Sequence, residues 1–130
     1  MNYKLQVWVD EQLMTLRADL PKGLAVFEEF LEGVITDEVN RNIVFEKIQS
    51  IKTGLVEEEY CGCNGVIADI KKDVVIIHNA TMEDMIERGL VNSIDVPDDQ
   101  VSCTIDIASF CEIIEDWITS LKQFKEKYKK

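Results

Sequence analysis

The sequence contains no apolar run long enough to cross a membrane. Its N-terminal stretch, MNYKLQVWVDEQL, holds a single lysine, and Gln6 and Asp10 interrupt its apolar residues. This pattern argues against both a secretory signal and a membrane span. We therefore expect a cytoplasmic protein, in which the four cysteines stay reduced.

Sequence motifs of several enzyme classes are also missing. The chain has no glycine-rich phosphate loop, no serine-centred nucleophile elbow and no His-Glu-x-x-His pair. No Asp-x-Asp-x-Asp-Gly loop is present to bind calcium. These absences favour a protein that is not an enzyme, needs no cofactor and functions through its surface.

Positive charge is scarce and unevenly placed. The 130 residues carry 25 Asp and Glu against 14 Lys and Arg, a net charge of -11. Five of the cations and one of the acids follow Trp117, so residues 1–117 hold 24 acids and 9 bases, a net charge of -15. Such a surface repels nucleic acids and anionic lipids, so we expect neither as a partner. The acidity either steers a basic protein partner or only keeps the protein soluble.

The last thirty residues contain the clearest structural pattern. Apolar side chains recur at steps of three and four, which predicts one long amphipathic helix. Asp106 precedes this run and is the expected N-cap, and Val101 to Ile105 is the expected strand before it. The predicted apolar stripe comprises Ile107, Phe110, Cys111, Ile114, Trp117, Ile118, Leu121, Phe124 and Tyr128. Such a stripe needs a sheet or other helices to pack against.

The N-terminal region is predicted to form a strand followed by a helix. Tyr3 to Val9 alternates weakly, with Trp8 on the same side as Lys4 and Gln6. Leu13 to Arg17 either pairs with this strand or begins a helix. A helix is expected after Pro21, with an apolar stripe of Leu24, Phe27, Phe30, Leu31, Val34 and Ile35.

A second helix is predicted to begin at a cap provided by Thr36 or Asp37 and to end at Gly54. Its expected apolar stripe is Val39, Ile43, Val44, Ile48 and Ile51. Because residues 42–51 are rich in β-formers, a strand is the alternative for this segment.

The second half of the chain begins with a predicted β-hairpin. Its strands are Val66 to Ile70 and Val74 to Ile77, joined by a polar turn over residues 71–73. Gly62 and Gly65 flank Cys63-Asn64, which suggests a bulge or a close backbone approach at the start of the first strand.

A short helix and a loop are predicted to come after this hairpin. Thr81 to Glu87 is expected to form a helical turn capped by Thr81, with Asp84 completing a capping box. Arg88 to Asp99 is predicted to be a loop with a possible short strand at Val91 to Ile94.

Together these elements predict a single domain over residues 1–130 of the α+β class. We expect a mainly antiparallel sheet of about four strands, helices packed on one face and a long C-terminal helix. No strand-helix-strand unit with a glycine-rich loop is present, which disfavours a nucleotide-binding sheet.

Two groups of residues could carry chemistry. The four thiols of Cys61, Cys63, Cys103 and Cys111 could hold a structural zinc ion or form a thiol module, which is the alternative function. Against it, Cys61 and Cys63 are two residues apart rather than three, and the other two fall in predicted core positions. The single histidine, His78, has no cysteine or serine placed beside it as a nucleophile, so we predict no catalytic residues.

Carboxylates form two dense clusters. These clusters are Glu28, Glu29 and Glu32, and Glu57, Glu58 and Glu59. Each cluster is either an ordinary solvated face or a site that binds a basic protein. We take these six residues as the candidate partner-binding residues.

The order of elements resembles a known family. A helical first half ends in FEKIQSIKTG, the acidic hairpin EEEYCGCNGVIADIKKDVVIIHN comes next, and SCTIDIASFCEIIEDWITSL supplies a strand and a helix. This pattern, over roughly residues 42–121, resembles small cytoplasmic immunity proteins of bacterial polymorphic-toxin and contact-dependent growth inhibition systems. Phe110 and Trp117 are its most recognisable residues, whereas Cys61 and Cys63 are not part of it.

The resemblance implies a function. Immunity proteins of these systems bind and block a cognate toxin domain, often a nuclease, and are frequently acidic. Nuclease active sites attract phosphates and are therefore cationic, so an acidic inhibitor gains association rate by electrostatic steering. We therefore expect an immunity protein that neutralises a basic toxin domain and performs no chemistry of its own.

Overall fold

A computed structural model describes residues 4–128 and places them in an α+β fold. In chain order the elements are β1 (Gln6–Asp10), β2 (Thr15–Asp19), α1 (Ala25–Phe30), the π-helical turn η1 (Leu31–Ile35), α2 (Glu38–Lys52), β3 (Glu58–Cys63), β4 (Val66–Lys71), β5 (Val74–Asn79), α3 (Ala80–Glu87), the 3-10 turn η2 (Ser93–Asp95), α4 (Asp98–Val101), β6 (Ser102–Asp106) and α5 (Ile107–Tyr128). Within these residues, an antiparallel sheet has the order β3-β4-β5-β6, and β1 and β2 form a separate hairpin. The predicted fold class is confirmed.

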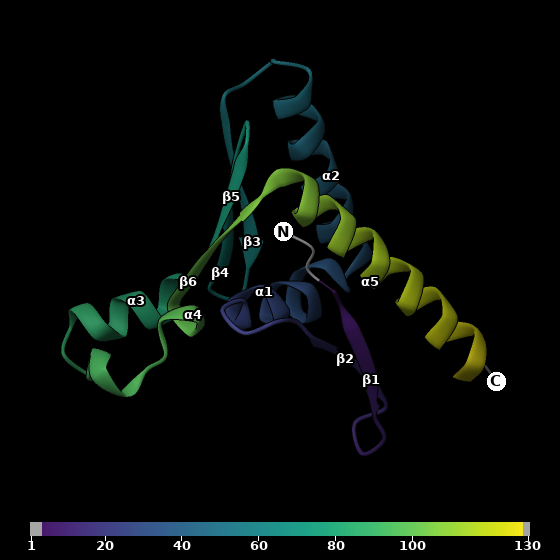
Figure 1. The fold of residues 1–130 in the computed structure, drawn as a ribbon, viewed down its shortest axis with the longest axis horizontal. Coiled ribbons are helices and arrows are strands. Elements are labelled where there is room, and N and C mark those ends of the chain that lie inside the picture. The colour runs from purple at the N-terminus through teal and green to yellow at the C-terminus, as the bar shows by residue number, and fades with distance from the viewer. Residues whose placement is uncertain (1–3, 129–130) are drawn as a thin grey trace.

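Helices α1, α2 and α5 cover one face of the β3-β4-β5-β6 sheet (Figure 1). Burial alternates along the strands, as expected for a sheet with one covered face. The covered face comprises Cys61, Val66, Ala68, Ile70, Val75, Ile77, Cys103 and Ile105. The opposite face carries the cross-strand row of Tyr60, Asp69, Ile76 and Thr104.

Aromatic side chains join α1 and α5 beneath the sheet. The Phe110 ring lies 5.3 Å from that of Phe27 and 5.9 Å from that of Phe30, and all three are fully buried. Trp117 is also fully buried, and its Nε1 donates to Thr36 Oγ1 at 3.1 Å, which satisfies its one polar atom. The predicted stripe from Leu24 to Ile35 is buried throughout, as expected.

The strand and long helix predicted at the C-terminus are both present. Asp106 caps α5, because its Oδ2 accepts from the Ser109 backbone N–H at 2.9 Å. This bond to the ionised carboxylate lowers the pKa of Asp106. Ile113 was not placed in the predicted stripe, yet it is buried, and Val101 belongs to α4 rather than to the strand.

The strand predicted at the N-terminus is confirmed, and the segment after it forms a second strand. β2 pairs with β1 in antiparallel register, with Trp8 opposite Arg17, so Leu13 to Arg17 does not begin a helix. Tyr3 lies outside the described residues. This hairpin does not join the main sheet, whose fourth strand is β3 instead.

The segment predicted as a second helix is α2, and the strand alternative for it is wrong. Asp37 is its cap, with Oδ2 accepting from the Asn40 N–H at 2.9 Å, and Gly54 lies just beyond its end with a φ of 75°. Val44, Ile48 and Ile51 are buried, but Val39 and Ile43, which were also expected in the stripe, are exposed. Val39 precedes Val44 by five residues, which places it about 140° away around the helix. The buried stripe of Val44, Ile48 and Ile51 is narrower than the predicted one and faces the sheet.

A strand that the sequence pattern did not predict, β3, lies beside β4. The two strands are joined by Asn64-Gly65, whose φ angles of 55° and 84° suit the tight turn that connects twisted strands. The Asn-Gly pair was the sequence signal for this hairpin. The predicted close approach is confirmed, since a Cβ added to Gly62 would lie 2.1 Å from the Val66 carbonyl oxygen.

The cap predicted for the helix over residues 81–87 is wrong. Asn79 caps α3 by accepting from the Met82 N–H at 2.9 Å, whereas Thr81 packs against Gly65. The possible strand at Val91 to Ile94 is also wrong, because Asn92 Oδ1 accepts from the Ile94 N–H at 3.0 Å and starts the turn η2.

A helix needs about 20 mainly apolar residues to cross a bilayer. None of the helices within residues 4–128 combines the length and the apolarity needed to cross a bilayer.

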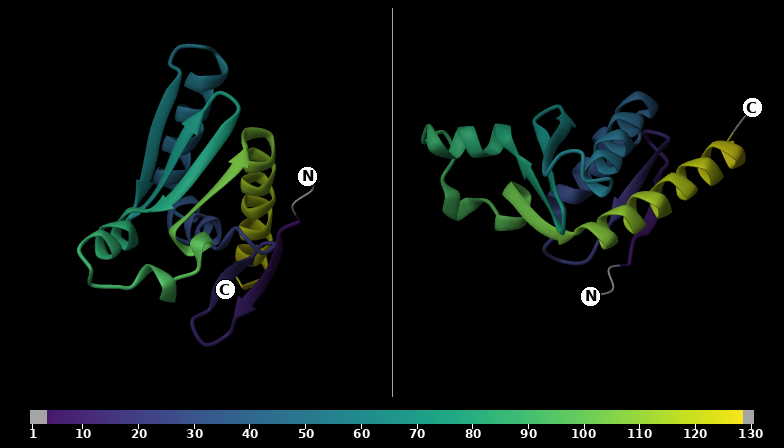
Figure 2. Two further views of the ribbon diagram at one scale, coloured as in Figure 1. Left: turned by 60° about the vertical axis from the view of Figure 1, so that its left-hand side comes forward. Right: turned by 90° about the horizontal axis from the view of Figure 1, so that it is seen from above.

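A region spanning residues 80–97 projects away from the rest of the fold (Figure 2).

The Gly62 contact gives a stability prediction. Gly62→Ala should lower the free energy of unfolding by about 2–4 kcal/mol, because its Cβ collides with backbone atoms of β4. Gly33→Ala is the matched control: among the described residues, nothing beyond its chain neighbours and its own helical backbone lies within 4 Å of its added Cβ, so it should be neutral or stabilise by about 0.5–1 kcal/mol. Urea unfolding of both variants measures this; equal effects would contradict the close approach.

Candidate partner-binding site

Two of the six candidate glutamates bind the free edge of the N-terminal hairpin. Glu28 Oε2 accepts from the Leu20 N–H at 2.6 Å, and Glu32 Oε2 accepts from the Ala18 N–H at 2.7 Å. Glu32 also accepts from Arg17 Nε at 3.1 Å. α1 and η1 therefore present carboxylates where a third strand would present carbonyl groups. Neither residue belongs to an ordinary solvated face.

A groove of about 370 Å³ lies along this junction. Its lining residues are Trp8, Arg17, Ala18, Asp19, Ala25, Glu28, Glu29, Glu32 and Gln100. Trp8 is 51% exposed, and the Arg17 guanidinium carbon lies 5.8 Å from its ring centroid. Among the described residues that line this groove, Arg17 is the only cation and faces four carboxylates.

The carboxylates of the groove repel one another. Burial raises the pKa of Glu28, and the charges of Asp19, Glu32 and Asp99 raise it further, while the bond from Leu20 opposes the shift. Asp99 reaches this position from α4, where its Oδ2 accepts from the Ala25 N–H at 3.1 Å. The groove therefore favours a ligand that brings positive charge, such as a lysine or arginine side chain.

Glu29 is the candidate with the most exposed position in the groove. Its only hydrogen bond among the described residues is a long one, 3.4 Å, from Asn79 Nδ2. The sequence patterns did not point to Trp8 and Asp19, which line the groove, or to Asp99 beside it. A tryptophan on the polar side of a predicted strand was the available signal for Trp8.

The second glutamate cluster lies elsewhere. The end of β3 at Cys63 contacts η1, because the Cys63 thiol donates to the Gly33 carbonyl at 3.6 Å. Glu58 is at the other end of β3, five residues or about 16 Å along the strand from Cys63. Lys71 Nζ lies 3.7 Å from Glu58, and Lys47 Nζ lies 2.8 Å from Glu59. The structure therefore does not join the two clusters into one acidic site.

The groove beside Glu57 and Glu58, of about 900 Å³, is of mixed charge. Lys52, Lys71 and Lys72 line it together with acidic residues. It lacks the excess of negative charge found near Glu28.

Glu58 also belongs to a carboxyl pair on the open face of the sheet. A hydrogen bond with Asp69 lowers the pKa of Glu58, whereas burial and that same bond raise the pKa of Asp69. The buried Oδ1 of Asp69 has no hydrogen-bond partner among the described residues. Glu58 therefore interacts with neighbouring side chains of the same sheet.

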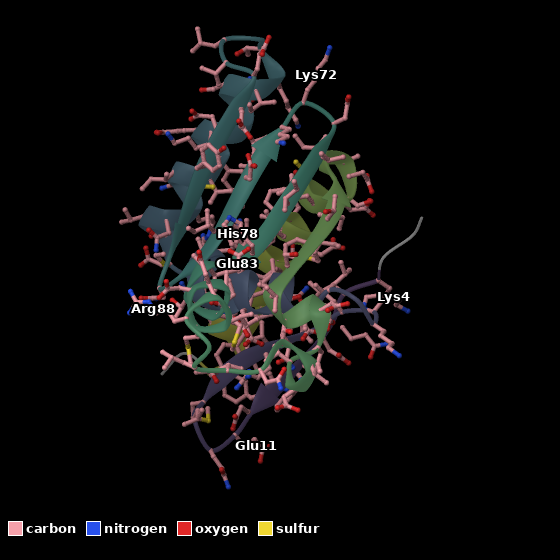
Figure 3. The ribbon with its side chains drawn as sticks, turned by 90° about the vertical axis from the view of Figure 1, so that its left-hand side faces the viewer. Lys4, Glu11, Lys72, His78, Glu83 and Arg88 are labelled. Atoms are coloured by element: carbon pink, nitrogen blue, oxygen red, sulfur yellow. The ribbon has the colours of Figure 1, made fainter. Side chains whose placement is uncertain are left out.

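His78 and Glu83 form a separate pair on this face. His78 Nδ1 lies 2.6 Å from Glu83 Oε1, and Figure 3 shows the two side chains together near the start of α3. The histidine is half-buried and hydrogen-bonded, and no described cysteine or serine side chain bonds to it.

The four cysteines are not gathered together. Cys61 and Cys103 lie in one cross-strand row but on opposite edge strands, so three strand spacings of about 4.8 Å separate them. Burial raises the pKa of Cys61 to about 12 and that of Cys103 to about 11. Within residues 4–128, no group of three or more His, Cys, Asp or Glu has the arrangement to hold a metal ion. The fold gives the four-thiol alternative no common site.

Comparisons with protein-family models, with curated proteins and with solved structures found no match to this chain.

The strain at Glu28 predicts a pH-dependent stability difference. Since its pKa is raised in the folded state, ionisation destabilises the fold, and this cost is complete above the folded pKa. Glu28→Gln keeps an oxygen for Leu20 and should be more stable than the wild type at pH 7. The difference should shrink as the pH falls through the folded pKa toward 4.5. Urea unfolding at several pH values measures it, with Glu29→Gln as the control.

The thiols should differ in reactivity. Cys61 and Cys103 should resist iodoacetamide in the native protein, because burial shields them and raises their pKa values. Cys63 is half-buried at the end of β3 and should be alkylated first. Mass spectrometry of partly labelled protein gives the order. Faster labelling of Cys61 than of Cys63 would contradict the described burial.

Proposed function

We propose that this protein is a non-enzymatic immunity protein that binds and neutralises a basic toxin domain in the cytoplasm. The expected class of toxin is a nuclease, in keeping with the resemblance to immunity proteins. Neither nucleic acid nor a membrane is a partner in this proposal. The fold class by itself does not select a function, so the proposal depends on the groove between β2 and α1.

One observation carries the proposal: a half-exposed tryptophan lies in a groove whose carboxylates outnumber its cations by four to one. Exposed tryptophans are frequent anchors of protein interfaces, because they bury a large area at little entropic cost. Surrounding carboxylates attract a cationic partner and raise its association rate. Trp8 would therefore supply contact area, while the carboxylates supply orientation.

The surroundings of Arg17 favour a basic side chain of the partner as the group that enters the groove. Its guanidinium already lies between the Trp8 ring and Glu32, which is the environment that an incoming arginine would meet beside Glu28 and Glu29. Planar guanidinium groups suit both aromatic faces and carboxylates. By contrast, the groove beside Glu57 and Glu58 is lined by as many lysines as acids, so we assign the main contact to the Glu28, Glu29 and Glu32 cluster.

The proposal is tested with the protein encoded by the adjacent reading frame. We expect a one-to-one complex whose affinity falls steeply with salt. Trp8→Ala should weaken it by about 30-fold, which corresponds to roughly 2 kcal/mol, and Glu29→Lys should weaken it by at least about 10-fold. Isothermal titration at two salt concentrations measures both effects.

Glu112→Lys is the matched control for charge. It changes the net charge as Glu29→Lys does, but Glu112 is exposed on α5, away from the groove. It should therefore reduce affinity far less. Equal losses for the two reversals would show that only net charge matters, and the absence of any complex would overturn the proposed function.

A further inference from the structure

Residues 80–97 form a projecting segment, here named the arm, which comprises α3, η2 and their connections. Figure 1 shows it extending from the lower end of the sheet, on the side opposite α5. From Ala80 to Ser102 no residue is buried, although the segment includes an eight-residue helix. A helix this short gains little stability by itself, so α3 depends on partial contacts. The apolar residues of the arm are therefore only partly covered.

The part of the arm after α3, residues 88–97, here named the tip, exposes two large aliphatic side chains. Leu90 is 69% exposed and Ile94 is 87% exposed. Both are held by defined turns: Gly89, with a φ of 74°, ends α3 just before Leu90, and Asn92 caps the turn that contains Ile94. The arm thus presents these side chains on ordered backbone.

The charge around this apolar tip has one sign. The arm carries Glu83, Asp84, Glu87 and Asp95 against a single cation, Arg88. Arg88 Nε lies 3.1 Å from Asp84, so its charge is already paired. An arm that carries net negative charge and exposed apolar side chains is complementary to an apolar pocket near lysines or arginines.

The arm is continuous with the groove between β2 and α1. Asn79, which caps α3, also donates to Glu29, and α4 supplies Asp99 and Gln100 at the other end of the arm. The arm and the groove therefore adjoin each other at Asn79 and α4. This matters because a stable interface needs about 800 Å² from each protein, which a groove of this size does not provide alone.

We propose that the arm is a second docking element for the same basic partner, inserting Leu90 and Ile94 into an apolar pocket rimmed by cations. This inference rests on the proposed function and adds the kind of surface that the partner must offer. The groove orients the partner by charge, and the arm tip slows its dissociation by burying apolar area.

The experiment uses the full-length chain and a catalytically inactive form of the protein encoded by the adjacent reading frame. The double variant Leu90→Ser, Ile94→Ser should bind about 30-fold more weakly, mainly through faster dissociation, with little change in salt dependence. Glu87→Lys should instead slow association at low salt. Surface plasmon resonance separates the two rates.

Two controls exclude trivial effects. Leu55 is 78% exposed in the connection between α2 and β3, so Leu55→Ser removes a comparable aliphatic side chain elsewhere and should leave binding unchanged. The double variant should unfold at the same urea concentration as the wild type, since neither side chain is buried. In the complex, amides of residues 86–95 should exchange more slowly with deuterium than in the free protein.

The possible outcomes are distinct. If the arm variant binds as tightly as the wild type while Trp8→Ala binds weakly, the arm inference is wrong and the proposed function stands. If the wild-type chain forms no complex, the proposed function fails and this inference fails with it. If instead the chain alone sediments as a dimer that the arm variant abolishes, a second copy occupies the tip and the inference is overturned.

Discussion

The rest of the molecule depends on two carboxylates that take the place of a β-strand. Glu32 accepts from the Ala18 amide of β2 and Glu28 from the Leu20 amide just after it, and these bonds attach the N-terminal hairpin to the helical layer. An isolated two-stranded hairpin is marginal in water, so this attachment lets β1 hold Trp8 in a defined position. It also creates the groove, because the hairpin meets α1 through side chains rather than through a continuous sheet. One set of bonds thus supports both the architecture and the candidate site.

The same carboxylates carry an energetic conflict that suits a binding surface. Asp19 and Asp99 add charge beside Glu28, and Arg17 neutralises only part of it. A protein selected for stability alone would distribute these charges more widely. A cationic partner would relieve this repulsion on binding, and the relief would add to its affinity. The arm shows a related compromise, since its tip leaves apolar side chains in water.

Local patterns predicted the helices and the central strands, because apolar periodicity and capping residues act over a few neighbours. Asp37 and Asp106 cap the helices that their positions indicated, and the Leu24 to Ile35 stripe is buried. Contacts between distant segments were beyond that reasoning: the bonds from Glu28 and Glu32 to β2 depend on how the hairpin docks. β3 was missed for another reason, since its residues EEYCGC have little β-propensity and are held by the Asn64-Gly65 turn. Predicting the groove requires both the local sequence patterns and the way the hairpin docks on α1, so the sequence indicated only its glutamates.

The two tryptophans occupy opposite environments, and this gives the molecule two separate optical reporters. Trp117 is sealed in the core, where its indole should emit at short wavelength until the chain unfolds. Trp8 stands half in water beside a guanidinium, so its indole should emit at longer wavelength and respond to whatever enters the groove. Occupancy of the groove and loss of the fold therefore shift the spectrum in different ways, and one unlabelled sample distinguishes a ligand from a denaturant.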